Sequence, residues 1–264
     1  MPTYSLTLEY DGTDFAGWQI QPSARTAMGV FKDALNAVTS ETPALTAAGR
    51  TDAGAHAHGQ VVGCTLERGW DPATLRKALN ATLPADIAVR QAAVRSSDFD
   101  ARRDAVERTY RYVIVCRDGR APVLRRNAWT VRDPLDIDAM RSAAAHLVGR
   151  HDFAAFGSAP RTGGSTVRQV AAVSVDRNAV ASDAAEPDID AVVITVHADA
   201  FLRGMMRSFT GALVKIGQGR ATPAWLGSLV DTATTRDPSV SVAPARGLHQ
   251  WSVRYEPTPQ ELAA

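Results

Sequence analysis

Lysine, cysteine and aromatic residues are scarce in this chain of 264 residues. Aromatic side chains make up 6% of it, and the thiols are limited to Cys64 and Cys116. These cysteines lie far apart in apolar, strand-like stretches, which favours buried free thiols over a disulfide or a metal site. No apolar run approaches the ~20 residues of a membrane span, and the start lacks the features of a secretory signal. The absences predict a cytoplasmic protein without a membrane segment.

Net charge is also nearly absent, at +1. Global charge therefore gives no sign of a nucleic-acid partner. Three of the 29 cationic side chains are lysine and the rest are arginine, which suits bidentate phosphate contacts and stacking on bases. A GC-rich genome is the simpler explanation of the overall arginine excess. Local clusters are better candidates for phosphate contacts: Arg102-Arg103, Arg108 with Arg111, Arg125-Arg126, and Arg203 with Arg207.

Hydrophobic periodicity in the first part of the chain predicts the order β-α-β-β-α-β. Apolar and polar residues alternate from Tyr4 to Tyr10, as in a half-buried strand. Thr26 and Asp71 are suited to cap helices, and Pro72 fits the first helical position after Asp71. The predicted strands cover 4–10, 44–48, 60–66 and 86–94, and the predicted helices cover 26–38 and 71–83.

The second part of the chain predicts the same order. Its strands are expected over 109–116, 167–175, 191–196 and 248–255, and its helices over 137–148 and 201–216. Gly149 is expected to close the first of these helices, and a further short helix follows Pro223. The acidic, small-residue stretch 178–190 resembles a solvated hairpin loop.

Two β-α-β-β-α-β units form the split-βαβ, ferredoxin-like pattern. The sequence thus predicts an α+β (mixed α/β) fold with two domains, 1–104 and 105–264, and a hinge near 102–107. The units share a predicted topology without repeated sequence.

The stretch from Ala48 to His56 contains a single acid, Asp52, bracketed by Gly49 and Gly54. It lies between two predicted strands, a common place for chemistry on a rigid scaffold. Asp52 is suited to act as a nucleophile, as a base, or as a turn former. Arg50 would keep Asp52 ionised and oriented if both side chains point into one cleft; otherwise the two form a weak surface ion pair.

Other candidate residues each have a structural alternative. His56 and His58 have no convincing third metal ligand, so a turn or strand-start role is favoured. Tyr110, in a strand with interleaved basic residues, fits the core and also fits a platform for stacking a base. Arg203 and Arg207 are expected to share a helix face, either solvated or aimed at phosphates or Asp52. No phosphate-binding glycine motif is present in the sequence.

The stretch 49–56, followed by Gly59-Gln60-Val61-Val62, resembles the signature of the tRNA pseudouridine synthase A family. Similar blocks run through nearly the whole chain: Glu9-Tyr10-Asp11-Gly12-Thr13, Phe15-Ala16-Gly17-Trp18-Gln19, Leu83-Pro84-Ala85-Asp86-Ile87, Phe99-Asp100-Ala101-Arg102, Thr109-Tyr110-Arg111-Tyr112, Asp152-Phe153 with Phe156, and Gly247-Leu248. The resemblance implies a mixed, mainly antiparallel sheet flanked by helices, with an active-site cleft between the halves.

The resemblance also implies roles for matching residues. Asp52 would be the nucleophile, Arg50 its ion-pair partner, Tyr110 the residue stacking on the target base, and Arg207 a second basic residue near the aspartate. The implied activity is isomerisation of uridine to pseudouridine at positions 38, 39 and 40 in the anticodon stem-loop of tRNA. A homodimer is implied, and neither a cofactor nor a metal.

Three positions depart from the family pattern: 27–29 at the start of the first helix, Arg203-Gly204, and Gln250. They bear on the tRNA contacts, dimer contacts and site preference, and none removes a proposed catalytic group. Two alternatives stay open at this stage. One is a non-catalytic RNA-binding protein of the same fold, and the other is a pseudouridine synthase acting at other tRNA positions.

Overall fold

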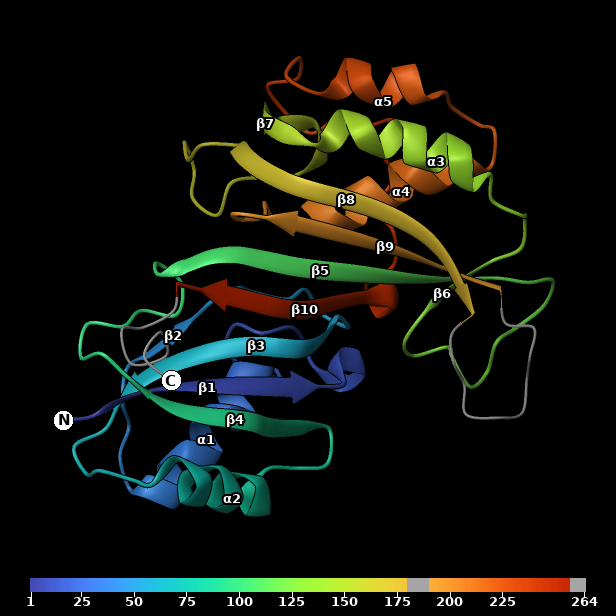
Figure 1. Ribbon diagram of the computed structural model, residues 1–264. Helices are drawn as coiled ribbons and strands as arrows, with labels where there is room; N and C mark the ends of the chain where they lie inside the picture. Colours follow the sequence, from blue (N-terminus) through green and yellow to red (C-terminus); the bar gives the residue numbers. More distant parts are fainter. Residues whose placement is uncertain (180–189, 257–264) are drawn as a thin grey trace. The chain divides into compact units, whose positions relative to one another are not determined.

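The computed structural model describes residues 1–179 and 190–256 (Figure 1). The described residues form two compact units, one from 1–108 and 250–256, the other from 109–179 and 190–249. The division falls inside two strands, β5 (Ala105–Cys116) and β10 (Leu248–Tyr255). The sequence placed the boundary after residue 104 and assigned the last strand to the second domain, whereas the described residues 250–256 group with the first unit.

The first unit has the predicted order β-α-β-β-α-β. Its elements before β5 are β1 (Thr3–Tyr10), α1 (Ala27–Thr39), β2 (Leu45–Ala47), β3 (His56–Thr65), α2 (Pro72–Thr82) and β4 (Ile87–Arg95), and most of β10 joins them. Strand β1 pairs antiparallel with both β4 and β3, and β2 pairs antiparallel with β3. This 4-1-3-2 arrangement confirms the ferredoxin-like prediction for this unit.

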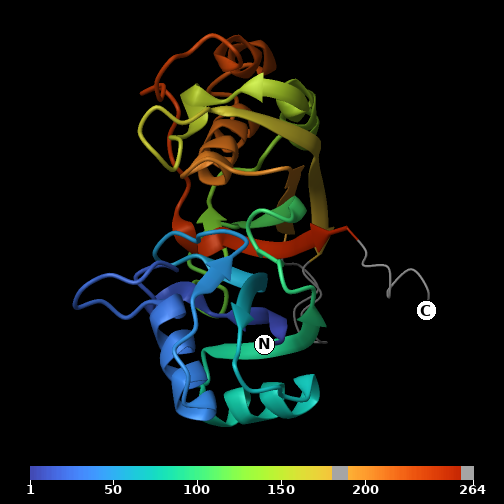
Figure 2. The ribbon, with the colours of Figure 1, turned by 90° about the vertical axis from the view of Figure 1, so that its left-hand side faces the viewer.

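The caps and the core of the first unit follow from its sequence pattern. The Thr26 side chain accepts the N–H of Gly29, and the Asp71 side chain accepts that of Thr74, as predicted for N-caps. The alternating apolar face of β1 is buried against α1 and α2, which lie on one side of the strands (Figure 1, Figure 2). Buried contributors include Tyr4, Leu6, Leu8, Tyr10, Phe31, Leu35, Leu75 and Leu79.

The second unit contains the strand order β5-β9-β8-β7. Its elements are β6 (Trp129–Val131), α3 (Ile137–Ala144), β7 (Gly149–Asp152), β8 (Val167–Ala179), β9 (Asp190–Ala198), α4 (Met205–Gly217) and α5 (Pro223–Leu229), together with the 3-10 turns η2 (Ala145–Leu147), η3 (Ala154–Phe156) and η4 (Ala245–Gly247). Strands β8 and β9 pair antiparallel, and β6 pairs parallel with β5. The predicted loop over 178–190 lies largely outside the described residues.

Two predicted helices are shorter than expected. The helix expected to reach residue 148 ends at Ala144. Gly149 has a φ of +126° and is the first residue of β7, which pairs with β8. The helix expected from residue 201 begins at Met205, because Gly204 precedes it in the left-handed region at φ +77°. Arg203 therefore lies before the helix, and the prediction that it shares a helix face with Arg207 is wrong.

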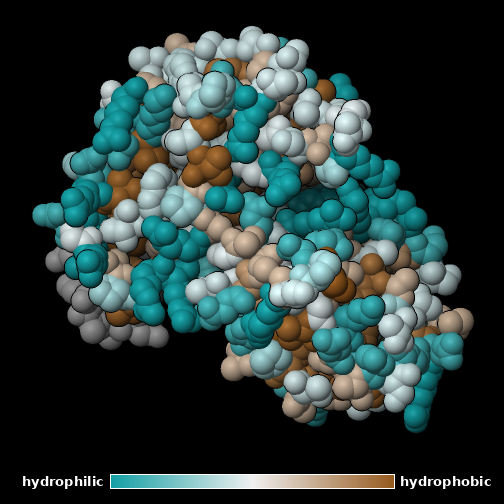
Figure 3. Space-filling model, turned by 180° about the vertical axis from the view of Figure 1, so that it is seen from behind, coloured by the Kyte–Doolittle hydropathy of each residue, from teal (hydrophilic) through white to brown (hydrophobic). Residues whose placement is uncertain are grey.

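The face in Figure 3 is mostly hydrophilic, and its apolar residues form small separate patches. Large exposed apolar side chains among the described residues are scattered along the chain: Met1, Ile20, Val94, Val123, Val148 and Val242. None of the helices within 1–179 and 190–256 is long and apolar enough to cross a membrane. Both cysteines are free, and burial raises the pKa of the Cys64 thiol to about 12.

Candidate functional site

The loop that carries Asp52 connects β2 to β3 in the first unit. We call residues 48–55 the aspartate loop. Asp52 is half-buried and Arg50 is exposed. The loop contains a tight turn in which the N–H of Ala55 donates to the carbonyl of Asp52 at 3.1 Å. Gly54 occupies the left-handed region at φ +78°, as its place in the motif suggested.

Buried polar side chains hold the first half of the aspartate loop. Arg108 Nε donates to the Ala48 carbonyl at 3.2 Å, and Gln60 Nε2 donates to the Gly49 carbonyl at 2.8 Å. Gln250 Nε2 in turn donates to Gln60 Oε1 at 3.0 Å, and both glutamines are fully buried. An unpaired buried polar group is costly, so these bonds favour a single position for the backbone leading to Asp52.

The end of β1 and its connection to α1 hold the loop on either side of Asp52, at Thr51 and at Gly54. The hydroxyl groups of Tyr10 and Thr51 share a buried hydrogen bond of 2.8 Å. The N–H of Trp18 donates to the Thr51 carbonyl at 3.1 Å, and the N–H of Gly54 donates to the Phe15 carbonyl at 3.2 Å. The ring centroids of Tyr10 and Trp18 lie 6.1 Å apart in a stacked arrangement, so a pair of packed aromatic side chains supports this side of the loop.

Gly17, in the same connection, lies against the backbone of the aspartate loop around Asp52. Its φ of +93° lies in the region that favours glycine. A Cβ added there would lie 3.0 Å from the carbonyl oxygen of Thr51, 3.2 Å from the nitrogen of Ala53 and 3.4 Å from the carbonyl carbon of Asp52. A side chain at this position would press on the backbone of the catalytic candidate.

Arg50 precedes Asp52 by two residues on the aspartate loop, and the role of ion-pair partner that the resemblance implied for Arg50 stays a prediction. Within the described part of the chain, the exposed guanidinium of Arg50 makes no ion pair. Asp52 does have polar interactions of its own. Arg50 is therefore available to a ligand approaching the loop.

The two histidines that follow the loop have structural roles. His56 is the first residue of β3, and its Nδ1 accepts the N–H of Gly12 at 3.1 Å. The ring of His58 lies 4.5 Å from that of Trp251. Among the residues described, no group of three or more potential metal ligands is present. The strand-start interpretation of His56 is confirmed.

Tyr110 belongs to β5 in the second unit and is 7% exposed. Its ring packs against Phe201 in an edge-to-face arrangement, with the centroids 4.6 Å apart. The local interpretation of Tyr110 as a core residue agrees with this burial, and a stacking role requires a base to reach the part of the ring left open.

Arg207 lies in the first turns of α4, also in the second unit. Its Nε donates to the Ala243 carbonyl at 2.7 Å, and the N–H of Ala243 donates back to the Arg207 carbonyl at 3.0 Å. The first bond holds the guanidinium of Arg207, and the second holds its backbone. Arg203, by contrast, is exposed and precedes the helix.

The three departures from the family pattern have local structural reasons. Gly29 leaves room for the Thr26 cap, because a Cβ there would lie 2.9 Å from Thr26 Oγ1. Gly204 supplies the left-handed residue that precedes α4. Gln250 places a buried amide beside Gln60 and so supports the aspartate loop.

Sequence reasoning missed the residues that fasten the loop: Gly17, Gln60, Arg108 and Gln250. Their partners lie far away along the chain, so no local pattern indicates the contacts. Arg108 belonged to a cluster named as a candidate for phosphate contacts, yet it is buried and its guanidinium donates to backbone carbonyls. A half-buried carboxylate on a loop fixed from both sides is suited to act as a nucleophile or a base.

Comparison with known proteins identifies one family over nearly the whole chain. The family described as tRNA pseudouridine synthase matches residues 7–104 and 143–256. A tRNA pseudouridine synthase A of Syntrophotalea carbinolica is 40% identical over 257 residues, covering 97% of this chain and 98% of the relative. The protein of that name from Myxococcus xanthus is 38% identical over 259 residues, covering 98% of this chain and 94% of the relative.

Proposed function

This chain belongs to the tRNA pseudouridine synthase family, and we propose that it isomerises uridine to pseudouridine in tRNA. The observation that carries the proposal is the placement of Asp52. Its carboxylate sits on a loop whose backbone carbonyls are bound by Arg108, Gln60 and the N–H of Trp18. The turn at Asp52 is already closed by a backbone hydrogen bond, so the Asp52 side chain is not needed to form it. A carboxylate on a fixed backbone is instead suited to react with a bound substrate.

The reaction that we propose needs no redox or phosphoryl step. The bond between N1 of uracil and C1′ of ribose breaks, the base turns, and a bond from C5 to C1′ forms. C5 loses its proton and N1 takes up a proton, so the product is an isomer of the substrate. Asp52 supplies the nucleophile that attacks an electrophilic carbon of the nucleotide and is released unchanged at the end. The target uridines are those at positions 38, 39 and 40 of the anticodon stem-loop.

Other residues have supporting roles in this proposal. A paired uridine must leave its stack before it reacts, and the exposed Arg50 is suited to fill the space that it vacates. Tyr110 stacks on the target base, and Arg207 supplies a second positive charge to the reacting group. The working form is a homodimer that binds one tRNA by its shape and backbone, which agrees with a net charge of only +1.

Tritium release tests the proposed reaction. An unmodified tRNA transcript labelled at C5 of uridine is incubated with the purified chain, without added cofactor or metal. The tritium should be released to water, because C5 loses its hydrogen when it forms the bond to C1′ of ribose. A transcript that keeps its label under these conditions would contradict the proposed function.

Gly17→Ala should lower turnover by roughly 10²-fold, because a displacement of the aspartate loop by about 1 Å misaligns Asp52. The new methyl group would press on the backbone at Thr51 and Ala53. Single-turnover rates at saturating tRNA measure the effect. Gly119→Ala is the matched control, since Gly119 has a similar φ of +99° but open space around its Cβ position. Equal rates for the two variants would show that the contact at Gly17 does not position Asp52.

A further inference from the structure

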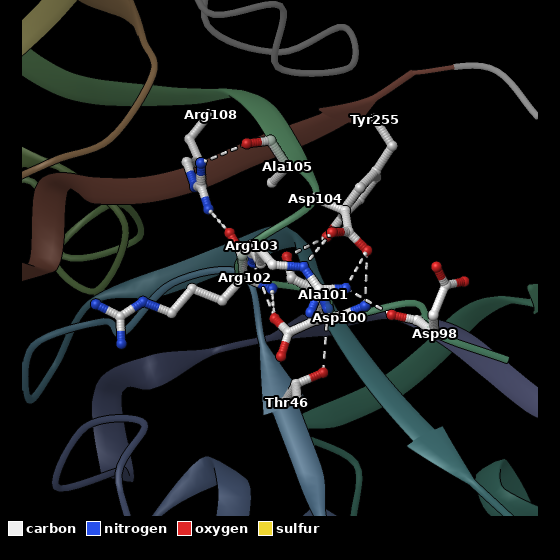
Figure 4. A network of polar contacts seen from close by, with 10 residues as sticks. All are labelled: Thr46, Asp98, Asp100, Ala101, Arg102, Arg103, Asp104, Ala105, Arg108 and Tyr255. Carbon is white, nitrogen blue, oxygen red and sulfur yellow. Dashed lines mark hydrogen bonds and ion pairs between the residues drawn. The ribbon is translucent and has the colours of Figure 1, made fainter. Parts of the chain in front are cut away.

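A dense polar network stabilises the segment between β4 and β5, residues 98–104, together with the first residue of β5 (Figure 4). Asp100 Oδ1 accepts the N–H groups of Arg102 and Arg103, both at 2.8 Å. Asp104 Oδ2 accepts the N–H of Asp100, also at 2.8 Å. Both carboxylates thus bind backbone N–H groups, and this bond to Asp100 is the main reason that the pKa of Asp104 is lowered.

Two contacts tie the same segment to strands of the first unit. The N–H of Ala101 donates to Thr46 Oγ1 on β2 at 3.1 Å. The hydroxyl of Tyr255 on β10 donates to the Ala101 carbonyl at 2.7 Å. Ala101 itself is fully buried. The backbone next to Arg102 is therefore held from two directions.

Arg108 links this segment to the aspartate loop. Its guanidinium is buried and donates to the carbonyls of Arg102 at 2.6 Å, Ala105 at 2.9 Å and Ala48 at 3.2 Å. One guanidinium therefore binds the backbone of Arg102 and also the first residue of the loop that carries Asp52. The Arg102 backbone lies beside the start of the aspartate loop and is fixed with respect to it.

The adjacent arginines of this segment differ in what their side chains do. Arg103 Nε donates to Asp104 Oδ1 at 2.8 Å, and Arg103 Nη2 donates to the Asp98 carbonyl at 2.6 Å. The Arg102 side chain is exposed and extends away from the network (Figure 4). Among the described residues its guanidinium makes no hydrogen bond or ion pair. In the predicted Arg102-Arg103 cluster, Arg103 is thus paired with Asp104, whereas the Arg102 guanidinium is exposed to solvent.

We propose that Arg102 binds a backbone phosphate of the RNA next to the nucleotide engaged by the aspartate loop. This inference rests on the proposed function, since it takes tRNA as the substrate. A guanidinium matches a phosphate with two parallel N–H bonds, which makes arginine well suited to this contact. The fixed backbone of Arg102 means that binding orders only its side chain, which lowers the entropic cost of the contact. Arg102 sets the register of the RNA backbone and reads no base.

Equilibrium binding of an unmodified tRNA transcript at several salt concentrations tests the assignment. Arg102→Ala should weaken binding roughly tenfold and reduce the slope of log affinity against log salt by about 1. Arg103→Ala removes the same charge one residue away, and it should change both quantities much less because that charge is already paired with Asp104. Arg102→Lys should retain the wild-type slope with intermediate affinity.

Equal losses for Arg102→Ala and Arg103→Ala, or an unchanged slope in Arg102→Ala, would overturn the phosphate assignment. Thermal unfolding of each variant separates a binding loss from a folding defect, and Arg102→Lys gives a second readout that does not depend on the alanine variant. Tritium release by the wild-type chain is followed in the same preparations. Its absence would refute the proposed function, whereas release together with equal losses would refute only the role of Arg102.

Discussion

Replacing Asp52 by asparagine should lower pseudouridine formation by at least ~10⁴-fold while leaving tRNA binding largely intact. Asparagine keeps the size of the side chain and removes the ionised oxygen that attacks the nucleotide. The fold should persist, because the aspartate loop is fastened through the backbone of its other residues, such as Ala48 and Gly49. Single-turnover rates with excess enzyme measure the loss, and a filter-binding assay measures the affinity.

Asp71→Asn is the matched control for the change at Asp52. Asp71 belongs to the same unit, is exposed, and caps α2 by accepting the N–H of Thr74 at 2.8 Å. Asparagine is also a good N-cap residue, so this variant removes one negative charge with little effect on the helix. Its turnover should match that of the wild type. Turnover near the wild-type level in Asp52→Asn would refute the nucleophile assignment.

Tyr110→Ala should reduce turnover by about 10- to 100-fold, the range expected when a base loses one aromatic stacking partner. Tyr110→Phe keeps the ring and should retain most of the turnover. The alanine variant also loses packing against Phe201, which is expected to cost about 3–5 kcal/mol of the free energy of unfolding. Rates are therefore compared at a temperature where thermal unfolding shows each variant to be folded.

Phe201→Leu separates stacking from packing at Tyr110. This change weakens the same ring pair from the other side and leaves Tyr110 in place. If Tyr110 acts on the base, Phe201→Leu should lose stability with only a small loss of turnover. Equal losses of turnover in Phe201→Leu and Tyr110→Ala would return Tyr110 to a purely structural role in the core.

Local sequence patterns predicted the elements whose stability is local. The alternation along β1 and the caps Thr26 and Asp71 correctly placed β1, α1 and α2. The short strands β6 and β7 were missed, because three or four residues carry no clear alternation and depend on partners that are distant in sequence. The start of α4 was placed too early, because the apolar residues before it continue the helical spacing while Gly204 is left-handed.

In the candidate site, too, the sequence indicated the local features and missed the contacts between distant residues. The motif around Asp52 was recognisable, because its residues are contiguous. The fastening of that loop was not, because Arg108 and Gln250 reach it from strands far along the chain. Gln250 was read as a departure from the family pattern, and its buried bond to Gln60 gives the position a physical reason. Arg102 and Arg103 are alike in sequence, and only the structure distinguishes the paired side chain from the open one.

The central claim is that this chain alone converts uridine to pseudouridine in the anticodon stem-loop. The most direct test is to incubate the purified chain with an unmodified tRNA transcript that has uridines at positions 38, 39 and 40, in the presence of a metal chelator and without added cofactor. Pseudouridines are then mapped at nucleotide resolution along the whole tRNA. We predict conversion at these positions and nowhere else, whereas an unmodified transcript, or pseudouridine confined to other positions, would contradict the claim.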